Sequence, residues 1–105
     1  MTVDLSRCFV TVHDPELALG FYRDLLELEV RMDVARGEFR WITVGSTDQP
    51  EVAIVLSNYL QGSAADVATV TSLLAKGALN AVHFRTANLD AVFARLRDAG
   101  VEVLD

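Results

Sequence analysis

Few side chains in this sequence could carry out chemistry, and they lie in short apolar segments. His83 carries an imidazole, whose ordinary pKa suits proton transfer near neutral pH. Arg7 and Arg85 could bind the carboxylate or phosphate of a ligand, and Trp41 could stack on a planar molecule. The alternatives are a histidine hydrogen-bonded to a neighbour, arginines paired with this chain's own acids, and a tryptophan that only fills space.

Sequence patterns of several common catalytic and nucleotide-binding sites are absent. The chain has no Gly-x-Ser-x-Gly turn for a nucleophilic serine, no phosphate-binding loop and no Gly-x-Gly-x-x-Gly. Its one cysteine, Cys8, lies in an apolar run, so we expect it to be reduced and buried rather than nucleophilic. One cysteine cannot form an internal disulfide, and we therefore expect a cytoplasmic protein.

Length and composition predict one globular domain over residues 1–105. Of these 105 residues 51% are hydrophobic, which is enough to build a modest core. The formal net charge of −6 argues against nucleic acid as a partner, because phosphate binding needs a basic surface. No apolar run approaches the roughly 20 residues of a membrane-spanning helix, so we expect no membrane partner.

The first half of the chain predicts short strands around one helix. Residues 7–12 are mostly apolar and β-branched, as in a buried strand. Asp14 and Pro15 mark a helix start, because aspartate caps free N–H groups and proline fits the first helical turn. We expect three further strands in an antiparallel meander, at residues 28–35, 39–44 and 52–57.

The second half repeats the beginning of the first. A linker helix is expected over residues 63–76, followed by a strand, a helix and the start of a strand, at 79–86, 89–99 and 101–104. Asn88 aligns with Asp14 as a helix cap. The pattern therefore predicts an α+β fold in which module one (5–58) is β-α-β-β-β and partial module two (79–105) stops after β-α-β.

An open strand edge remains where the chain ends. Three explanations stay open at this point: a truncated sequence, a natural tail beyond Asp105, or a partner chain that supplies the edge. A longer chain would complete the second module by itself, whereas a partner would complete it in an oligomer.

Three segments together resemble the vicinal oxygen chelate superfamily, which includes glyoxalase I, bleomycin-resistance proteins and extradiol dioxygenases. They are VHDPELALGFYRDLL (12–26), FRWITV (39–44) and NLDAVFARLRDAGV (88–101). The resemblance implies paired β-α-β-β-β modules that form a cupped mixed sheet, a homodimer and a small-molecule ligand. Relatives commonly carry glycine where Glu27 ends the first helix, so Glu27 has a positive φ or the turn takes another route.

Enzymes of this superfamily hold a divalent metal in the cup. The resemblance puts three of the four ligand positions on Arg7, Val55 and Ala81, and the fourth on a strand beyond this sequence. None of these three side chains can give a lone pair to a metal at neutral pH. We therefore expect no metal site and no cofactor.

Strand alternation predicts which side chains line the cup. The ligand-binding residues expected from it are Arg7, Phe9, Trp41, Thr43, Val55, His83 and Arg85, with Thr11, Ala53, Ser57 and Ala81 on the same faces. No catalytic residue is assigned, and His83 is the one weak candidate. This lining favours a metal-independent protein that binds a small aromatic or planar molecule. The alternatives are a glyoxalase-type lyase, isomerase or dioxygenase, and a chain that acts only through its dimer interface.

Overall fold

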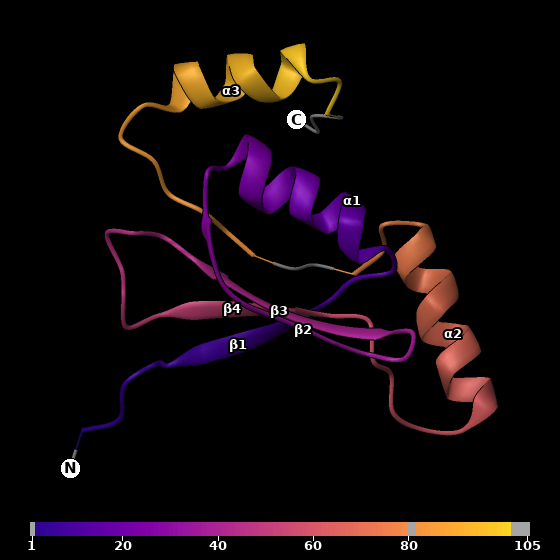
Figure 1. Ribbon diagram of the computed structural model, residues 1–105. Coiled ribbons are helices and arrows are strands. Elements are labelled where there is room, and N and C mark those ends of the chain that lie inside the picture. Colours follow the sequence, from indigo (N-terminus) through magenta and orange to yellow (C-terminus); the bar gives the residue numbers. More distant parts are fainter. Residues whose placement is uncertain (1, 80–81, 102–105) are drawn as a thin grey trace.

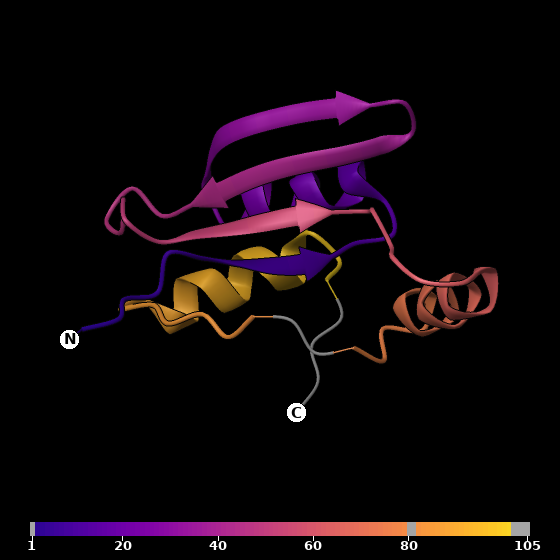
Figure 2. The same cartoon turned by 90° about the horizontal axis from the view of Figure 1, so that it is seen from below.

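A four-stranded mixed sheet organises the protein in the computed structural model, which describes residues 2–79 and 82–101. The strands lie in the order β1-β4-β3-β2, with β2, β3 and β4 antiparallel to their neighbours and β1 parallel to β4. Their bounds are β1 (Arg7–Thr11), β2 (Glu29–Arg36), β3 (Phe39–Gly45) and β4 (Ala53–Ser57). Figures 1 and 2 show this sheet with its helices. The α+β fold expected from the sequence is confirmed.

The first helix begins where the sequence predicts. The Asp14 carboxylate accepts hydrogen bonds from the backbone N–H groups of Glu16 and Leu17, at 3.0 and 3.3 Å. Helix α1 (Pro15–Leu19) then continues as a π-helix, η1 (Gly20–Leu25), whose wider turn the apolar spacing does not predict. The two segments form one continuous rod along the sheet (Figure 1).

The later helices also start at their predicted caps. The Ser63 side chain and Asp66 form a reciprocal capping box at the start of α2 (Ala64–Ala75). The Asn88 side chain accepts from the N–H of Ala91 at the start of α3 (Leu89–Asp98). No helix within residues 2–79 and 82–101 is long and apolar enough to cross a membrane.

The core lies on one side of the sheet. Ile42, Val44 and Leu56 are fully buried there against Leu19 and Tyr22 of the α1–η1 rod. Fully burying an aliphatic side chain stabilises the fold by about 1.5–3 kcal/mol, so these contacts attach the rod to the sheet. Both views place α1 on this side, and no helix of the described chain covers the opposite side (Figures 1 and 2). Side chains at alternate strand positions are therefore left on an open face.

The strand expected at 79–86 does not form in the part that is described. Residues 82–86 are not paired with any strand, although Val82 packs against the core and the Phe84 ring lies 6.2 Å from that of Tyr22. A strand gains stability from neighbouring strands, and residues 82–86 pair with none of the described ones. Residues 80–81, and positions 102–105 of the last expected strand, lie outside the described residues.

The prediction that Cys8 is buried is wrong, since its side chain is exposed. Cys8 lies on β1, which pairs with β4 on one side and with none of the described strands on the other. An edge strand leaves such positions open to solvent even when the sequence around them is apolar.

Glu27 takes the left-handed conformation, with φ of 61°, which is the first of the two routes expected for this turn. Its carboxylate forms an ion pair with the guanidinium of Arg95 in α3, at 2.7 Å. Both side chains are exposed, so this pair adds little stability. The backbone strain at Glu27 is therefore the larger effect at this position.

We expect Glu27→Gly to raise the free energy of unfolding by about 0.5–1 kcal/mol, because glycine adopts a positive φ without a steric clash. Chemical denaturation measures the change. Glu27→Gln is the matched control, since it removes the charge and keeps the strained Cβ. If the glycine variant is no more stable than the glutamine variant, the backbone at this position is not strained.

Candidate functional site

Strand register assembles the open face of the sheet into two adjacent rows of side chains. Paired residues of neighbouring strands point to the same side of a sheet. One row is Phe9, Val55, Thr43 and Met32, and the next is Thr11, Ser57, Trp41 and Val34. Each row crosses all four strands, so residues distant in sequence form one continuous surface.

A cleft of about 740 Å³ lies over the second row and is open to solvent on one side. Its wall is largely aromatic, and the four rings that border it are those of Phe9, Phe39, Trp41 and Tyr59. Ligand sites in proteins typically span about 300–1,000 Å³ and are lined mainly by apolar and aromatic groups. The cleft therefore has the size and lining of a small-molecule site.

The rings of the cleft form two edge-to-face pairs. Phe9 and Trp41 have centroids 5.0 Å apart, and Phe39 and Tyr59 have centroids 5.1 Å apart. The indole N–H of Trp41 donates to the hydroxyl of Thr43 at 3.1 Å, which holds the ring in place. Because this polar group already has a partner, the ring offers its apolar surface to the cleft.

The seven ligand-binding residues expected from the sequence fall into different places. Phe9 and Trp41 line the cleft, as do Thr11 and Ser57 from the same faces. Thr43 and Val55 lie on the open face in the first row, where they are buried and support the rings above. Arg7 is exposed on β1 and is not part of the cleft wall.

His83 and Arg85 are not brought to the aromatic cleft. Both are exposed in the unpaired stretch 82–86, and neither belongs to the cleft wall. Ala81, the third position of the expected metal set, lies outside the described residues. His83, the catalytic candidate, is thus not part of the cleft that Trp41 lines.

Sequence reasoning missed Phe39, Tyr59, Val34 and Arg36, all of which line the cleft. The sequence contained a signal that could have placed Phe39 and Tyr59 in the cleft. Phe39 precedes Trp41 by two positions and Tyr59 follows Ser57 by two, so the same alternation extends to both. Val34 and Arg36 lacked such a signal, because a β-bulge changes the alternation of their strand.

The bulge at Arg31 decides which face the end of β2 presents. Val30 pairs with Val44 on the helix side, whereas Met32 pairs with Thr43 on the open side. The extra residue between them shifts the alternation by one, so that later even-numbered residues of β2 reach the open face.

The Arg31 side chain holds this bulge in place. Its guanidinium donates to the backbone carbonyls of Ser46, Gln49 and Val52, with the shortest hydrogen bond, 2.7 Å, to Val52. These three residues lie in or beside the loop that joins β3 to β4. Arg31 therefore anchors the loop between β3 and β4. The bulge at the same residue turns the later side chains of β2 to the open face.

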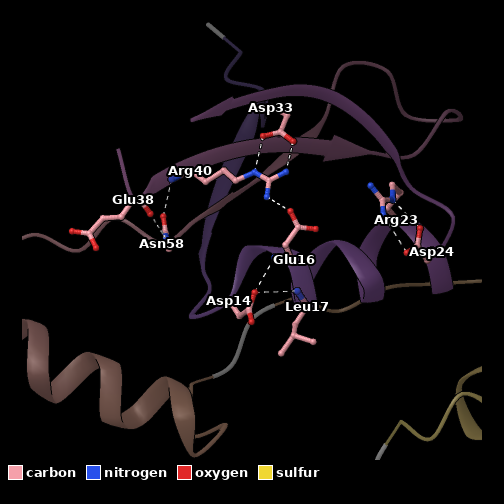
Figure 3. Close-up of polar contacts among 9 residues, drawn as sticks. All are labelled: Asp14, Glu16, Leu17, Arg23, Asp24, Asp33, Glu38, Arg40 and Asn58. Atoms are coloured by element: carbon pink, nitrogen blue, oxygen red, sulfur yellow. Dashed lines mark hydrogen bonds and ion pairs between the residues drawn. The ribbon is translucent and has the colours of Figure 1, made fainter. Parts of the chain in front are cut away.

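A second arginine, Arg40, ties the edge strand β2 to α1 (Figure 3). It donates two hydrogen bonds to the Asp33 carboxylate, at 2.6 and 2.9 Å, and also pairs with Glu16. The hydrogen bonds from Arg40 lower the pKa of Asp33, and those to Asp33 and Glu16 raise the pKa of Arg40. Although Arg40 borders the cleft, two carboxylates of the protein already neutralise its charge.

The donor set does not fit a metal of the family type. Arg7 and Val55 occupy two of the implied ligand positions, and neither offers a lone pair at neutral pH. Within the described ranges, 2–79 and 82–101, no three or more His, Cys, Asp or Glu side chains cluster where a metal could bind. We therefore derive no reaction step through a metal.

Comparison with known proteins identifies the family. The sequence profile of the Glyoxalase/Bleomycin resistance protein/Dioxygenase superfamily matches residues 4–105. The chain belongs to this superfamily. Uncharacterized protein YurT from Bacillus subtilis (strain 168) is 32% identical over 92 residues, which cover 88% of this chain and 71% of YurT.

Two solved structures have the same fold. UcmS2 matches 95% of this chain and 77% of its own, with 37% identity and a TM-score of 0.80. TnmS3, an antibiotic binding protein from Streptomyces sp. CB03234, matches 94% of this chain and 72% of its own, with 23% identity and a TM-score of 0.65. The likeness to TnmS3 shows the fold alone.

Proposed function

We propose that this protein binds a small planar aromatic molecule in the cleft on the open face of its sheet, without a metal. The aromatic wall of the cleft carries this proposal. Phe9, Phe39 and Tyr59 are 60%, 43% and 53% exposed to solvent, although each ring already packs edge-to-face on another. A contiguous set of exposed rings on a monomer marks a binding surface, because water disfavours such apolar area.

The expected affinity is modest for a small planar probe. Drug-sized ligands gain at best about 0.3 kcal/mol per non-hydrogen atom, so a tricyclic molecule of about 17 such atoms gains about 5 kcal/mol. This corresponds to a dissociation constant of roughly 200 μM. A larger natural ligand that fills more of the cleft would bind more tightly.

The chemistry of the cleft wall supports sequestration rather than catalysis. Its charged members are Arg36 and Arg40, and among the described residues no carboxylate, imidazole or thiol lines it. Arginine keeps its proton at any physiological pH, so it cannot serve as a general base. A lyase, isomerase or dioxygenase of the glyoxalase type would need groups from outside this wall.

We also propose that the protein is a cytoplasmic homodimer in which β1 meets a second copy. In the described structure β1 is an edge strand, and Val3 and Leu5, in the segment that precedes it, are exposed. A long apolar edge is a template for pairing with another chain. A second copy along this edge would cover Val3 and Leu5, leave Phe9 open to the cleft, and extend the sheet across two chains.

Sedimentation tests the dimer. We expect twice the mass of one chain for the natural sequence and the mass of one chain for Leu5→Lys, because the added charge lies at the proposed contact. Leu17→Lys is the matched control, since Leu17 is equally apolar and exposed but lies on α1. A single-chain mass of the natural protein at every concentration would remove the dimer from this proposal.

Binding is tested with anthracene-2-carboxamide, a neutral planar probe, by following its fluorescence during titration. We expect Trp41→Ala and Phe39→Ala each to weaken binding about tenfold, because loss of an aromatic contact costs about 0.5–1.5 kcal/mol beyond the lost area. Phe93→Ala should bind as the natural protein does, since Phe93 is exposed on α3, away from the cleft. Circular dichroism confirms that each variant is folded.

The proposal fails if the natural protein does not bind the probe. It also fails if Phe39→Ala and Phe93→Ala weaken binding equally, because the probe would then adhere to any exposed ring. The two independent cleft variants keep the test decisive if one of them does not fold.

A further inference from the structure

We infer that the natural ligand of the cleft carries an anionic group, of the aromatic carboxylate kind, and that Arg36 binds this group. The inference rests on the proposed function, since it describes a ligand of the same cleft. It assigns a role to a residue at the cleft's outer end, where β2 turns into β3.

Register places Arg36 beside the aromatic wall. Arg36 and Phe39 are paired across the β2–β3 turn, and both line the cleft. Phe39 in turn packs on Tyr59, so the arginine stands at the end of a ring pair. A flat molecule lying against these rings would present its edge, and any group on that edge, to the guanidinium.

Arg36 has no acidic partner in the part of the chain that is described. Five other arginines there each pair with a carboxylate of this protein: Arg23, Arg31, Arg40, Arg95 and Arg97. Arg7 and Arg85 also form no ion pair among the described residues, but of these three arginines Arg36 is the one that lines the cleft. Glu38 is only two residues away at the same turn, yet forms no ion pair with it in this structure.

The other cation of the cleft is not available to a ligand. Arg40 is held by Asp33 and Glu16, on the α1 side of the sheet, and its charge is already matched (Figure 3). Arg36 therefore supplies the uncompensated positive charge of the described cleft wall. The arginines that sequence reasoning favoured for this role, Arg7 and Arg85, lie outside that wall.

The guanidinium suits a carboxylate better than a neutral group. Its planar fork can donate two parallel hydrogen bonds to the two oxygens of a carboxylate. An amide has one such oxygen and no charge, so it gains less. Arg36 is exposed, so its guanidinium is free to meet a ligand that lies on the rings beside it.

The bulge at Arg31 supports the assignment, because it alone turns Arg36 to this face. Without the extra residue, the alternation that puts Val30 on the helix side would put Arg36 there as well. The bulge therefore places a charged side chain beside the aromatic rings of the cleft.

A matched pair of probes tests the inference: anthracene-2-carboxylate and anthracene-2-carboxamide, titrated at pH 7 by fluorescence. We expect the natural protein to bind the carboxylate about tenfold more tightly than the amide. Arg36→Gln should reduce this ratio to about one, and Arg36→Lys should keep part of it. Lys76→Gln is the control, because it removes the same charge from an exposed residue outside the cleft.

The outcomes separate this inference from the proposed function. Equal affinity of the natural protein for both probes, or a ratio that Arg36→Gln leaves intact, overturns the role of Arg36 alone. A ratio that Lys76→Gln abolishes equally also overturns it, because the preference would then reflect overall charge. If neither probe binds the natural protein, the proposed function itself fails.

Discussion

One-sided burial of the sheet is the constraint on which the rest of this structure depends. The α1–η1 rod covers the face that carries Ile42, Val44 and Leu56, and these side chains are completely buried. Because strand residues alternate, the same strands must present Phe9, Trp41 and their row partners on the other face. An aromatic surface is thereby held rigidly but left uncovered, which is the condition for binding a flat ligand.

Two arginines on β2 and β3 shape the edge of this surface. Arg31 holds a bulge that turns the end of β2 toward the open face, and Arg40 joins β2 to α1 through two carboxylates. Asn58 links the loop after β4 to the start of β3. Its side chain accepts a hydrogen bond from the backbone N–H of Arg40 and donates one to the carbonyl of Glu38 (Figure 3). These contacts fix the edge of the sheet where Arg36 meets the aromatic wall.

Much of the fold was predictable from the sequence, because local signals determine it. Caps at Asp14 and Asn88 and the alternation of the strands follow from the residues at those positions, whereas at Glu27 the resemblance left two routes open and the structure takes the left-handed one. The bulge and the π-helix were not, because neither the alternation of the strands nor the apolar spacing of the helix indicates them. For that reason Phe9 and Trp41 could be assigned to the site, whereas Arg36 could not, and His83 was expected in a strand that lacks neighbours here.

We propose that a ligand binds on the open aromatic face of the sheet. Nitrogen–proton correlation spectra of the labelled protein, recorded while anthracene-2-carboxylate is added, test it most directly. We expect shifts of the Trp41 indole resonance and of the amides of Arg36, Phe39 and Tyr59, with the amides of α2 and α3 unchanged. Shifts confined to the helices, or spectra that do not change at millimolar probe, would contradict it.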